Sequence, residues 1–399
     1  SYVRENFRDF VGLSAGKLRI GGTKWEVGVF GLEGFADARH NFESAGGYIG
    51  HPFVVDGQQH AFLFKARTVR GVLYDYYGGG IRQGFDPENG KFFDLIYRNR
   101  TEEMSAEYLY GIGKNNRIEI GPAFEHRINQ DYYINSSDQY TLQKTPALGV
   151  SKRAQDFYLN EQFLTQGVSL NVNTRNGYYF PMKNFQRYLF TEDQFEGLRT
   201  RTKVLHANPI FGLSDHYTLV DTYAVYQHNL FSDALRLETA LARTATFWEN
   251  RYATPRDDVW KVDVRFFNFH RWGTLAARTF TAVGNNMSAN ARREIAAQFT
   301  RGFYYGSFTP SSGFLASAEY RSPGVRLPYV LVAAVAFIDY VGVGDATRHF
   351  DWYPIVGFGL RTMLYEIDNN VFRLDFGFNL NDSNLNLLKA IQFGMNHAF

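Results

Sequence analysis

Hydrophobic and polar residues alternate with a period of two along much of this chain. Near its C-terminal end, Phe372, Leu374 and Phe376 share one face, while Arg373 and Asp375 share the other. Successive side chains of a β-strand point to opposite faces of the sheet, so such a segment predicts a strand with one apolar and one polar face.

The same alternation recurs in segments of about ten residues, which is the length of a strand that crosses a bilayer. Between two of them, 104–112 and 117–128, the turn Gly113-Lys114-Asn115-Asn116 predicts a tight hairpin. Strands of this length, joined alternately by short turns and longer loops, are typical of an outer-membrane barrel. We therefore predict an all-β fold, a single transmembrane antiparallel β-barrel over residues 1–399 in the outer membrane of a bacterium.

A helical membrane protein is excluded by the length of the apolar runs. The longest, residues 329–338, has about ten residues, whereas a spanning helix needs about 20. The mean hydropathy of −0.32 is compatible with a barrel, because half of each strand faces a polar lumen.

Composition supports the same class. The chain has 37 Phe, 26 Tyr and 5 Trp, and such an excess of rings fits the aromatic girdles at the two surfaces of a bilayer. A net charge of +2 gives no reason to expect nucleic acid as a partner. We expect contact with outer-membrane lipid and lipopolysaccharide, and with client polypeptides or other envelope proteins. The absence of cysteine excludes disulfides and thiolate metal sites.

The ends and loops of the barrel are also predicted from the pattern. The chain opens Ser1-Tyr2-Val3 without a signal peptide, which indicates a mature protein or a fragment. Residues 1–16 are interpreted as a short periplasmic lead-in, with the first strand near 17–35. Long loops, most of them extracellular, are expected at 80–97, 129–158, 180–200 and 283–312, with a short helix at 290–299.

The last strand carries a specific pattern. Ile391, Phe393, Met395 and Phe399 share one face, and the sequence ends on that Phe. This resembles the C-terminal signal strand of outer-membrane barrels, which the assembly machinery reads. Residues 387–399 are therefore predicted to form the closing strand.

Three spaced elements carry a family resemblance. They are the triplet Arg301-Gly302-Phe303, Glu319 within Ala318-Glu319-Tyr320, and Asp339 within Phe337-Ile338-Asp339. Together they resemble the superfamily of outer-membrane insertases and translocases that includes BamA, TamA and FhaC, the bacterial surface antigen family. The resemblance implies sixteen strands, and a loop, 283–312, that folds back into the lumen. It also implies that Arg301 meets Glu319 and Asp339.

Physical chemistry supports such a contact. A guanidinium in a partly dehydrated lumen needs carboxylate partners, and its planar fork suits them. Gly302 would let the loop tip turn tightly. The predicted role of Arg301, Gly302, Phe303, Glu319 and Asp339 is to lock the loop against the wall, not to catalyse a reaction. The alternative is an ordinary loop triplet beside an ordinary lumen carboxylate.

The sequence also departs from the family. The usable motifs cover about residues 290–399, and Tyr340-Val341-Gly342 shifts the expected glycine by one position. The family normally carries periplasmic polypeptide-transport-associated domains before the barrel, and this chain shows none. Because those domains receive clients, their absence from the sequence puts translocation in doubt.

Other motifs are weaker. Gly12-Leu13-Ser14-Ala15-Gly16 fits the nucleophile elbow of hydrolases, but the elbow needs a following helix and the next residues resemble a strand. We interpret it as a turn. His51 and His60 lack ligand spacing, Asp257, Asp258 and Asp263 favour a solvated turn, and Gly78-Gly79-Gly80 lacks the lysine of a phosphate loop. Alternating lumen charges, such as those at 117–127, are expected to form ladders. We predict no catalytic residue, metal or cofactor.

Three functions therefore remain open. The first is insertion or translocation of protein or lipid, as the resemblance implies, with the seam between first and last strands as the working part. The second is a passive porin or the structural barrel subunit of an outer-membrane complex. The third is the membrane anchor of an enzyme fused upstream of Ser1.

Overall fold

The structure of the chain is a computed structural model. It describes residues 2–5, 8–19, 25–36, 39–51, 58–74, 76–77, 80–81, 83–86, 88–94, 96–133, 163–183, 191–211, 216–230, 235–249, 254–287, 289–296, 298–299, 301–303, 310–344, 349–364, 371–382 and 391–395.

Strands dominate the described residues from one end of the chain to the other. The first half contains β1 (Tyr2–Glu5), β2 (Arg8–Arg19), β3 (Glu26–Ala36), β4 (Arg39–His51), β5 (His60–Tyr74), β6 (Tyr76–Tyr77), β7 (Gly80–Ile81), β8 (Gln83–Asp86), β9 (Lys91–Asp94), β10 (Ile96–Ile112), β11 (Asn116–Tyr133), β12 (Phe163–Lys183) and β13 (Thr191–Ala207).

The second half continues the series and adds two short helices. It contains η3 (Pro209–Phe211), β14 (Tyr217–Leu230), β15 (Leu235–Trp248), β16 (Arg256–His270), β17 (Gly273–Asn285), α2 (Ala289–Ala296), β18 (Ser312–Arg321), β19 (Val325–Leu327), β20 (Val330–Gly344), β21 (Phe350–Met363), β22 (Phe372–Asn379) and β23 (Ile391–Met395).

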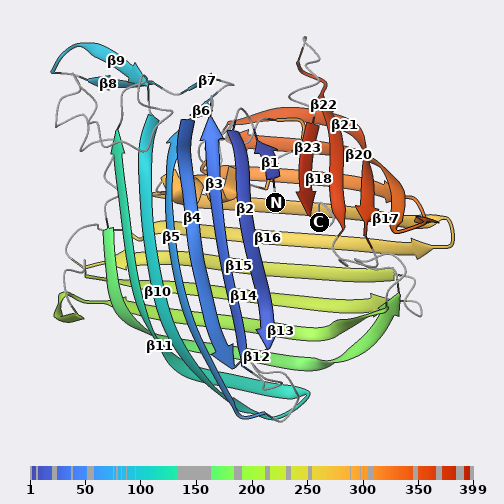
Figure 1. Ribbon diagram of the computed structural model, residues 1–399, viewed down its shortest axis with the longest axis horizontal. Coiled ribbons are helices and arrows are strands. Elements are labelled where there is room, and N and C mark those ends of the chain that lie inside the picture. The colour runs from blue at the N-terminus through green and yellow to red at the C-terminus, as the bar shows by residue number, and fades with distance from the viewer. Residues whose placement is uncertain are drawn as a thin grey trace.

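The long strands form one antiparallel sheet in which each strand pairs with the next. The order runs from β1 through β5 to β10, continues to β18, and passes by way of β20 to β23. The short strands β6 to β9 form two separate small hairpins between β5 and β10. Figure 1 shows the sheet curving strongly from its blue strands through green and yellow to its red ones.

The number of strands differs from the sixteen that the resemblance implies. Seventeen described strands of the large sheet have five residues or more, and the four-residue β1 precedes them. Residues 1–16 were expected to precede the barrel, but 2–5 and 8–19 lie in its first hairpin. The small residues of 12–16 weaken the alternation there, which is why the pattern missed these strands.

Loop boundaries were also partly wrong. Residues 180–183 and 191–200 belong to β12 and β13, which pair from Lys183 and Thr191 onward. Pro181 and Gly197 look like loop residues, although both take part in the ladder between β12 and β13. The expected hairpin at 113–116 is present, and the expected short helix is α2.

Apolar side chains cover the outside of the sheet. Exposed residues on β11 include Ile118, Ile120 and Phe124, whereas Arg117 on the opposite face is buried. Aromatic rings gather toward both ends of the strands, with Trp260 and Trp352 near one end and Trp272 near the other. An apolar band between aromatic girdles, around a polar interior, is the arrangement of an outer-membrane barrel.

Among the described residues, no helix has the length and apolar character needed to cross a membrane.

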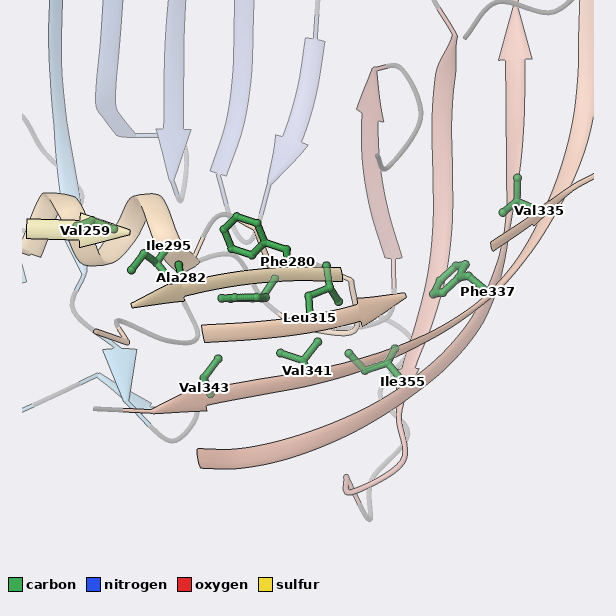
Figure 2. Close-up of a cluster of buried hydrophobic side chains, with 11 residues drawn as sticks. Val259, Phe280, Ala282, Ile295, Leu315, Val335, Phe337, Val341, Val343 and Ile355 are labelled. Carbon is green, nitrogen blue, oxygen red and sulfur yellow. The ribbon is translucent and has the colours of Figure 1, made fainter. Parts of the chain in front are cut away.

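One apolar cluster lies on the inner side of the sheet, against α2. Figure 2 shows Ile295 of α2 beside Ala282, with Phe280 and Leu315 close by on neighbouring strands. Phe299, which follows the helix, belongs to the same cluster. Helix α2 and Phe299 therefore cover part of the inner wall, and this explains why β20 is apolar on both faces.

Candidate functional site at the covered inner wall

The register of the last strands builds the site from rows of inward-facing residues. In one row Glu319 of β18 pairs with Phe337 of β20, which pairs with Gly357 of β21. In the next row Ser317 pairs with Asp339. Because side chains of paired residues lie on the same face, the two carboxylates project from one wall toward the same space.

Arg301 enters this space from the loop that follows α2. Its Nη1 donates to Glu319 Oε2 at 2.9 Å, and its Nε lies 3.0 Å from Asp339 Oδ2. Its Nη2 donates to Ser317 Oγ at 3.1 Å, and that hydroxyl in turn donates to Asp339 at 2.5 Å. The guanidinium carbon also lies 4.1 Å from the ring centre of Phe337. The arginine is thus held by charge, hydrogen bonds and a cation–π contact.

The network extends beyond the three predicted charges. Arg321 Nε donates to Glu319 Oε1 at 2.7 Å, and Arg361 Nη2 lies 3.6 Å from Glu319 Oε2. Arg361 also donates to Asp375 Oδ1 at 2.5 Å. All these groups are buried, and Glu319, Arg361 and Asp375 are each 0% exposed. Glu319 therefore interacts with three guanidinium groups, and all of these groups are buried from water.

Glycines on β22 and β21 make room for the loop tip and for the Phe337 ring beside it. A Cβ on Gly377 would lie 2.9 Å from the backbone nitrogen of Gly302, so the two backbones approach closely. Gly302 itself has φ of +77°, a conformation that favours glycine, and a Cβ there would meet Ile355 at 3.0 Å. Gly357 likewise leaves space for the ring of Phe337, which would lie 2.4 Å from an added Cβ.

Apolar contacts hold the segments on each side of the tip. Phe299 packs edge-on against Phe280 with ring centres 5.9 Å apart, and both rings are buried. Phe303 packs edge-on against Tyr353 at 5.2 Å. Figure 2 shows that this cluster extends across several strands of the wall. The loop is thus attached by an ion network between two apolar anchors.

The structure brings all five residues of the predicted lock to one place. Arg301, Glu319 and Asp339 are in direct contact, Gly302 forms the turn, and Phe303 packs on the wall. Ser317, Arg321 and Arg361 were not singled out from the sequence. The signal that could have found them is their parity, because each lies an even number of residues from Glu319 or on the polar face of a neighbouring strand.

The predicted signal strand is only partly described. Residues 391–395 form β23, where Phe393 and Met395 pair with Leu374 and Phe372 of β22. Residues 387–390 and 396–399, with Phe399 among them, lie outside the described residues. Within the described residues, no ladder joins β23 to β1 or β2.

The weaker motifs are dispersed. Ser14 lies inside β2 and pairs with Phe30 of β3, where a nucleophile elbow would need a strand followed by a helix. Asp258 bonds Arg243, whereas Asp263 bonds Arg265 and Arg278. Among the described residues, no group of three or more His, Asp or Glu side chains is placed to hold a metal ion. Gly78 and Gly79 lie outside the described residues.

Ion pairs also line the uncovered wall, as the alternating charges predicted. Arg117 lies 2.8 Å from Glu119, Lys203 lies 2.6 Å from Glu125, and Arg127 lies 3.2 Å from Glu103 on β10. The first pair lies within β11, the second joins β11 to β13 across β12, and the third joins β11 to its neighbour β10, so this part of the interior is polar.

Comparisons with known proteins find only distant structural likenesses, each to a solved protein of the outer membrane. No family model matches the chain, and no curated protein matches it in sequence. The siderophore receptor PirA from Acinetobacter baumannii superposes with a TM-score of 0.42 at 9% identity over 94% of this chain. BamA from Haemophilus ducreyi lacking POTRA domains 1–3 gives 0.44 at 13% identity over 99% of it, and covers 68% of that chain.

A third similar structure is OccAB2 from Acinetobacter baumannii. It has a TM-score of 0.32 at 11% identity, over 90% of this chain and 91% of that one. The chain spans 59% of the length of the siderophore receptor. Likenesses this distant assign no function.

This chain is an outer-membrane β-barrel. The assignment follows from its own surface, because apolar side chains and aromatic girdles face outward while ion pairs line the inner face. A barrel of antiparallel strands satisfies its backbone groups through its own ladders, as a bilayer requires.

Proposed function

We propose that this barrel inserts or translocates polypeptide, or lipid, at the outer membrane. In this proposal the segment 289–303 is a lumen lid, and the network around Arg301 is its lock. The observation that carries the proposal is the buried contact of Arg301 with Glu319 and Asp339, on a loop that packs against the inner wall. A passive channel has no evident need for such a costly buried arrangement.

In this proposal the client leaves the barrel between the strands at the two ends of the sheet. The lock residues lie on β18 and β20, and the loop tip touches β21 and β22, so the lid supports the wall that leads to β23.

The test is an insertion assay in lipid vesicles that contain the purified chain. An unfolded outer-membrane barrel is added as the client, and its folding is followed by protease resistance. We expect folding to be faster than in empty vesicles, and Arg301→Ala to slow it about tenfold, because the lid then leaves its place on the wall. Arg326→Ala, which changes an exposed arginine on β19, is the matched control and should change little.

Two outcomes would contradict the proposal. One is a client folding rate equal to that of empty vesicles, which would remove the insertase function. The other is equal acceleration of client folding by wild type and Arg301→Ala, which would mean that the lid has no part in the function. The measurement requires that both variants show the strand content and the heat-modifiable gel mobility of the folded barrel.

A passive porin is the second candidate, and one observation favours it. A hollow of about 410 Å³, lined by charged side chains, opens beside the lid on the inner side of β13 to β17. Conductance in planar bilayers distinguishes the two functions. A porin gives steady open channels in the wild type, whereas a locked lid gives low conductance that rises in Arg301→Ala.

A further inference from the structure

The hollow beside the lid is built by the register of five neighbouring strands. Arg199 of β13 pairs with Val225 of β14, which pairs with Ala240 of β15, and this row continues to Asp263 of β16 and Phe280 of β17. The adjacent rows bring further inward-facing residues to the same place: Tyr223, Ala242 and Lys261 on one side, and Gln227, Glu238, Arg265 and Arg278 on the other.

Small side chains form the floor, and long polar ones form the rim. The side chains at the centre of the wall are short, and this makes a recess there (Val225, Ala240 and Ala242). Arg199, Tyr223 and Lys261 stand around it. The resulting volume of about 410 Å³ lies in the range of small-molecule sites.

Arg199 has no carboxylate partner among the described residues. Its Nη2 donates to the neutral amide oxygen of Gln227 at 2.8 Å, and its guanidinium lies 5.0 Å from the ring centre of Phe195. Its Nε is buried without a hydrogen-bond partner in the described part of the chain. A partly buried cation held only by neutral groups favours an anion beside it.

The carboxylates of the hollow are already shared. Asp263 accepts from Arg265 and also from Arg278, each at about 3 Å. Glu238 accepts from Gln227 at 2.8 Å and from Arg236 at 2.9 Å.

Positive charge therefore exceeds negative charge in the hollow. Four cations, Arg199, Lys261, Arg265 and Arg278, face two carboxylates, so two positive charges remain. Glu294 on α2 lies 3.4 Å from Lys261, but its side chain is 72% exposed and offsets that charge only weakly.

We propose that this hollow binds a small organic anion that carries two or more carboxylate or phosphate groups. One group would lie against the guanidinium of Arg199 and the hydroxyl of Tyr223. A second would reach Lys261 and Arg265 across the floor of Ala240 and Ala242. The inner side of the sheet does not face lipid, so the ligand is a water-soluble molecule rather than a lipid headgroup.

The site also touches the lid. Gln298, two residues after the end of α2, lines the hollow, and its Oε1 accepts from Arg278 at 2.9 Å. A bound anion would either compete with Gln298 for Arg278 or add a further contact to it. Binding of the anion is therefore coupled to the position of the 289–303 segment. The site itself does not depend on the insertase proposal, because binding is measured without any client.

The test is calorimetric titration of the full chain in detergent with citrate and, separately, with pyrophosphate. Each titration is made at constant ionic strength, with chloride as the balancing anion. We expect saturable binding at one site, weakened about tenfold or more in Arg199→Gln through loss of a charge-assisted hydrogen bond. Arg127→Gln removes one lumen charge from β11, away from the hollow, and should change the dissociation constant less than twofold.

A second variant separates binding from folding. Ala240→Leu keeps every charge and fills the floor of the hollow, so it should abolish binding while the barrel remains folded. The proposal would be overturned if titrating citrate or pyrophosphate into the wild type released no more heat than titrating chloride. Equal affinity in wild type, Arg199→Gln and Ala240→Leu would overturn it as well, since the anions would then bind elsewhere.

Discussion

The two sides of the lumen contain the same kind of ion pair, but the pairs differ in their exposure to water. On the covered side, Arg301 and Glu319 lie 2.9 Å apart with side chains 7% and 0% exposed. On the open side, Arg127 and Glu103 lie 3.2 Å apart with side chains 45% and 38% exposed. The distances are similar, so the difference lies in how much water reaches each pair.

This comparison shows that the loop, more than the charges, makes the covered side special. An exposed pair contributes about 0–1 kcal/mol, because water and salt screen it. Breaking a buried pair leaves an uncompensated charge and costs about 3–5 kcal/mol. Glu319 and Asp339 are buried where Arg301 contacts them, and we expect these pairs in turn to keep the 289–303 segment in place.

The largest effect should come from Glu319→Gln. Arg301, Arg321 and Arg361 share this carboxylate in a buried space, and the neutral amide would leave them repelling one another. We expect the free energy of unfolding in lipid vesicles, measured by urea titration, to fall by about 3–5 kcal/mol.

Glu103→Gln is the matched control for that experiment. It makes the same chemical change in an exposed pair on β10, and the expected loss is below about 1 kcal/mol. Equal losses in the two variants would contradict the distinction between the covered and the open side.

A smaller effect is expected from Gly377→Ala. The added methyl would lie 2.9 Å from the backbone nitrogen of Gly302, and neither backbone can move aside as a side chain can. Overpacking of this kind costs about 1–3 kcal/mol, and the lid should lose protease protection in proportion.

Gly31→Ala on β3 provides the comparison for this variant, since a Cβ there meets nothing within 4 Å. It should leave both stability and lid protection unchanged. If Gly377→Ala behaved in the same way, the loop tip would not rest on β22.

The smallest effect is expected on the open side. Arg127→Ala should lower the free energy of unfolding by less than about 1 kcal/mol at low salt. The difference from wild type should vanish near 1 M salt, where the Debye length is about 3 Å. If the loss of free energy of unfolding persisted at high salt, it would contradict this expectation, because salt screens an exposed pair.

The sequence was sufficient for the class of fold. The period-two alternation in 104–112 and 117–128 predicted both strands and the turn between them, because the strand period follows directly from backbone geometry. It failed where that signal was weak. The small residues of 12–16 made β2 hard to recognise, and Pro181 and Gly197 made the ends of β12 and β13 look like loops.

The site was predictable only through its motif. Arg301, Glu319 and Asp339 were recognised from a family resemblance, and alternation alone marks them merely as polar-face residues. Ser317 and Arg361 complete the network because the register of β18, β20 and β21 places them beside these charges. Register depends on long-range pairing, which a single sequence does not specify residue by residue.

The most direct test of this account is amide hydrogen exchange of residues 289–303 in the full chain in lipid vesicles. In the wild type we expect the segment to exchange slowly, since Phe299 and Arg301 are buried against the wall, and Arg301→Ala should speed its exchange about a hundredfold, as loss of a buried ion pair implies. Fast exchange in the wild type, at the rate of an open loop, would contradict the claim that the lid is locked inside the barrel.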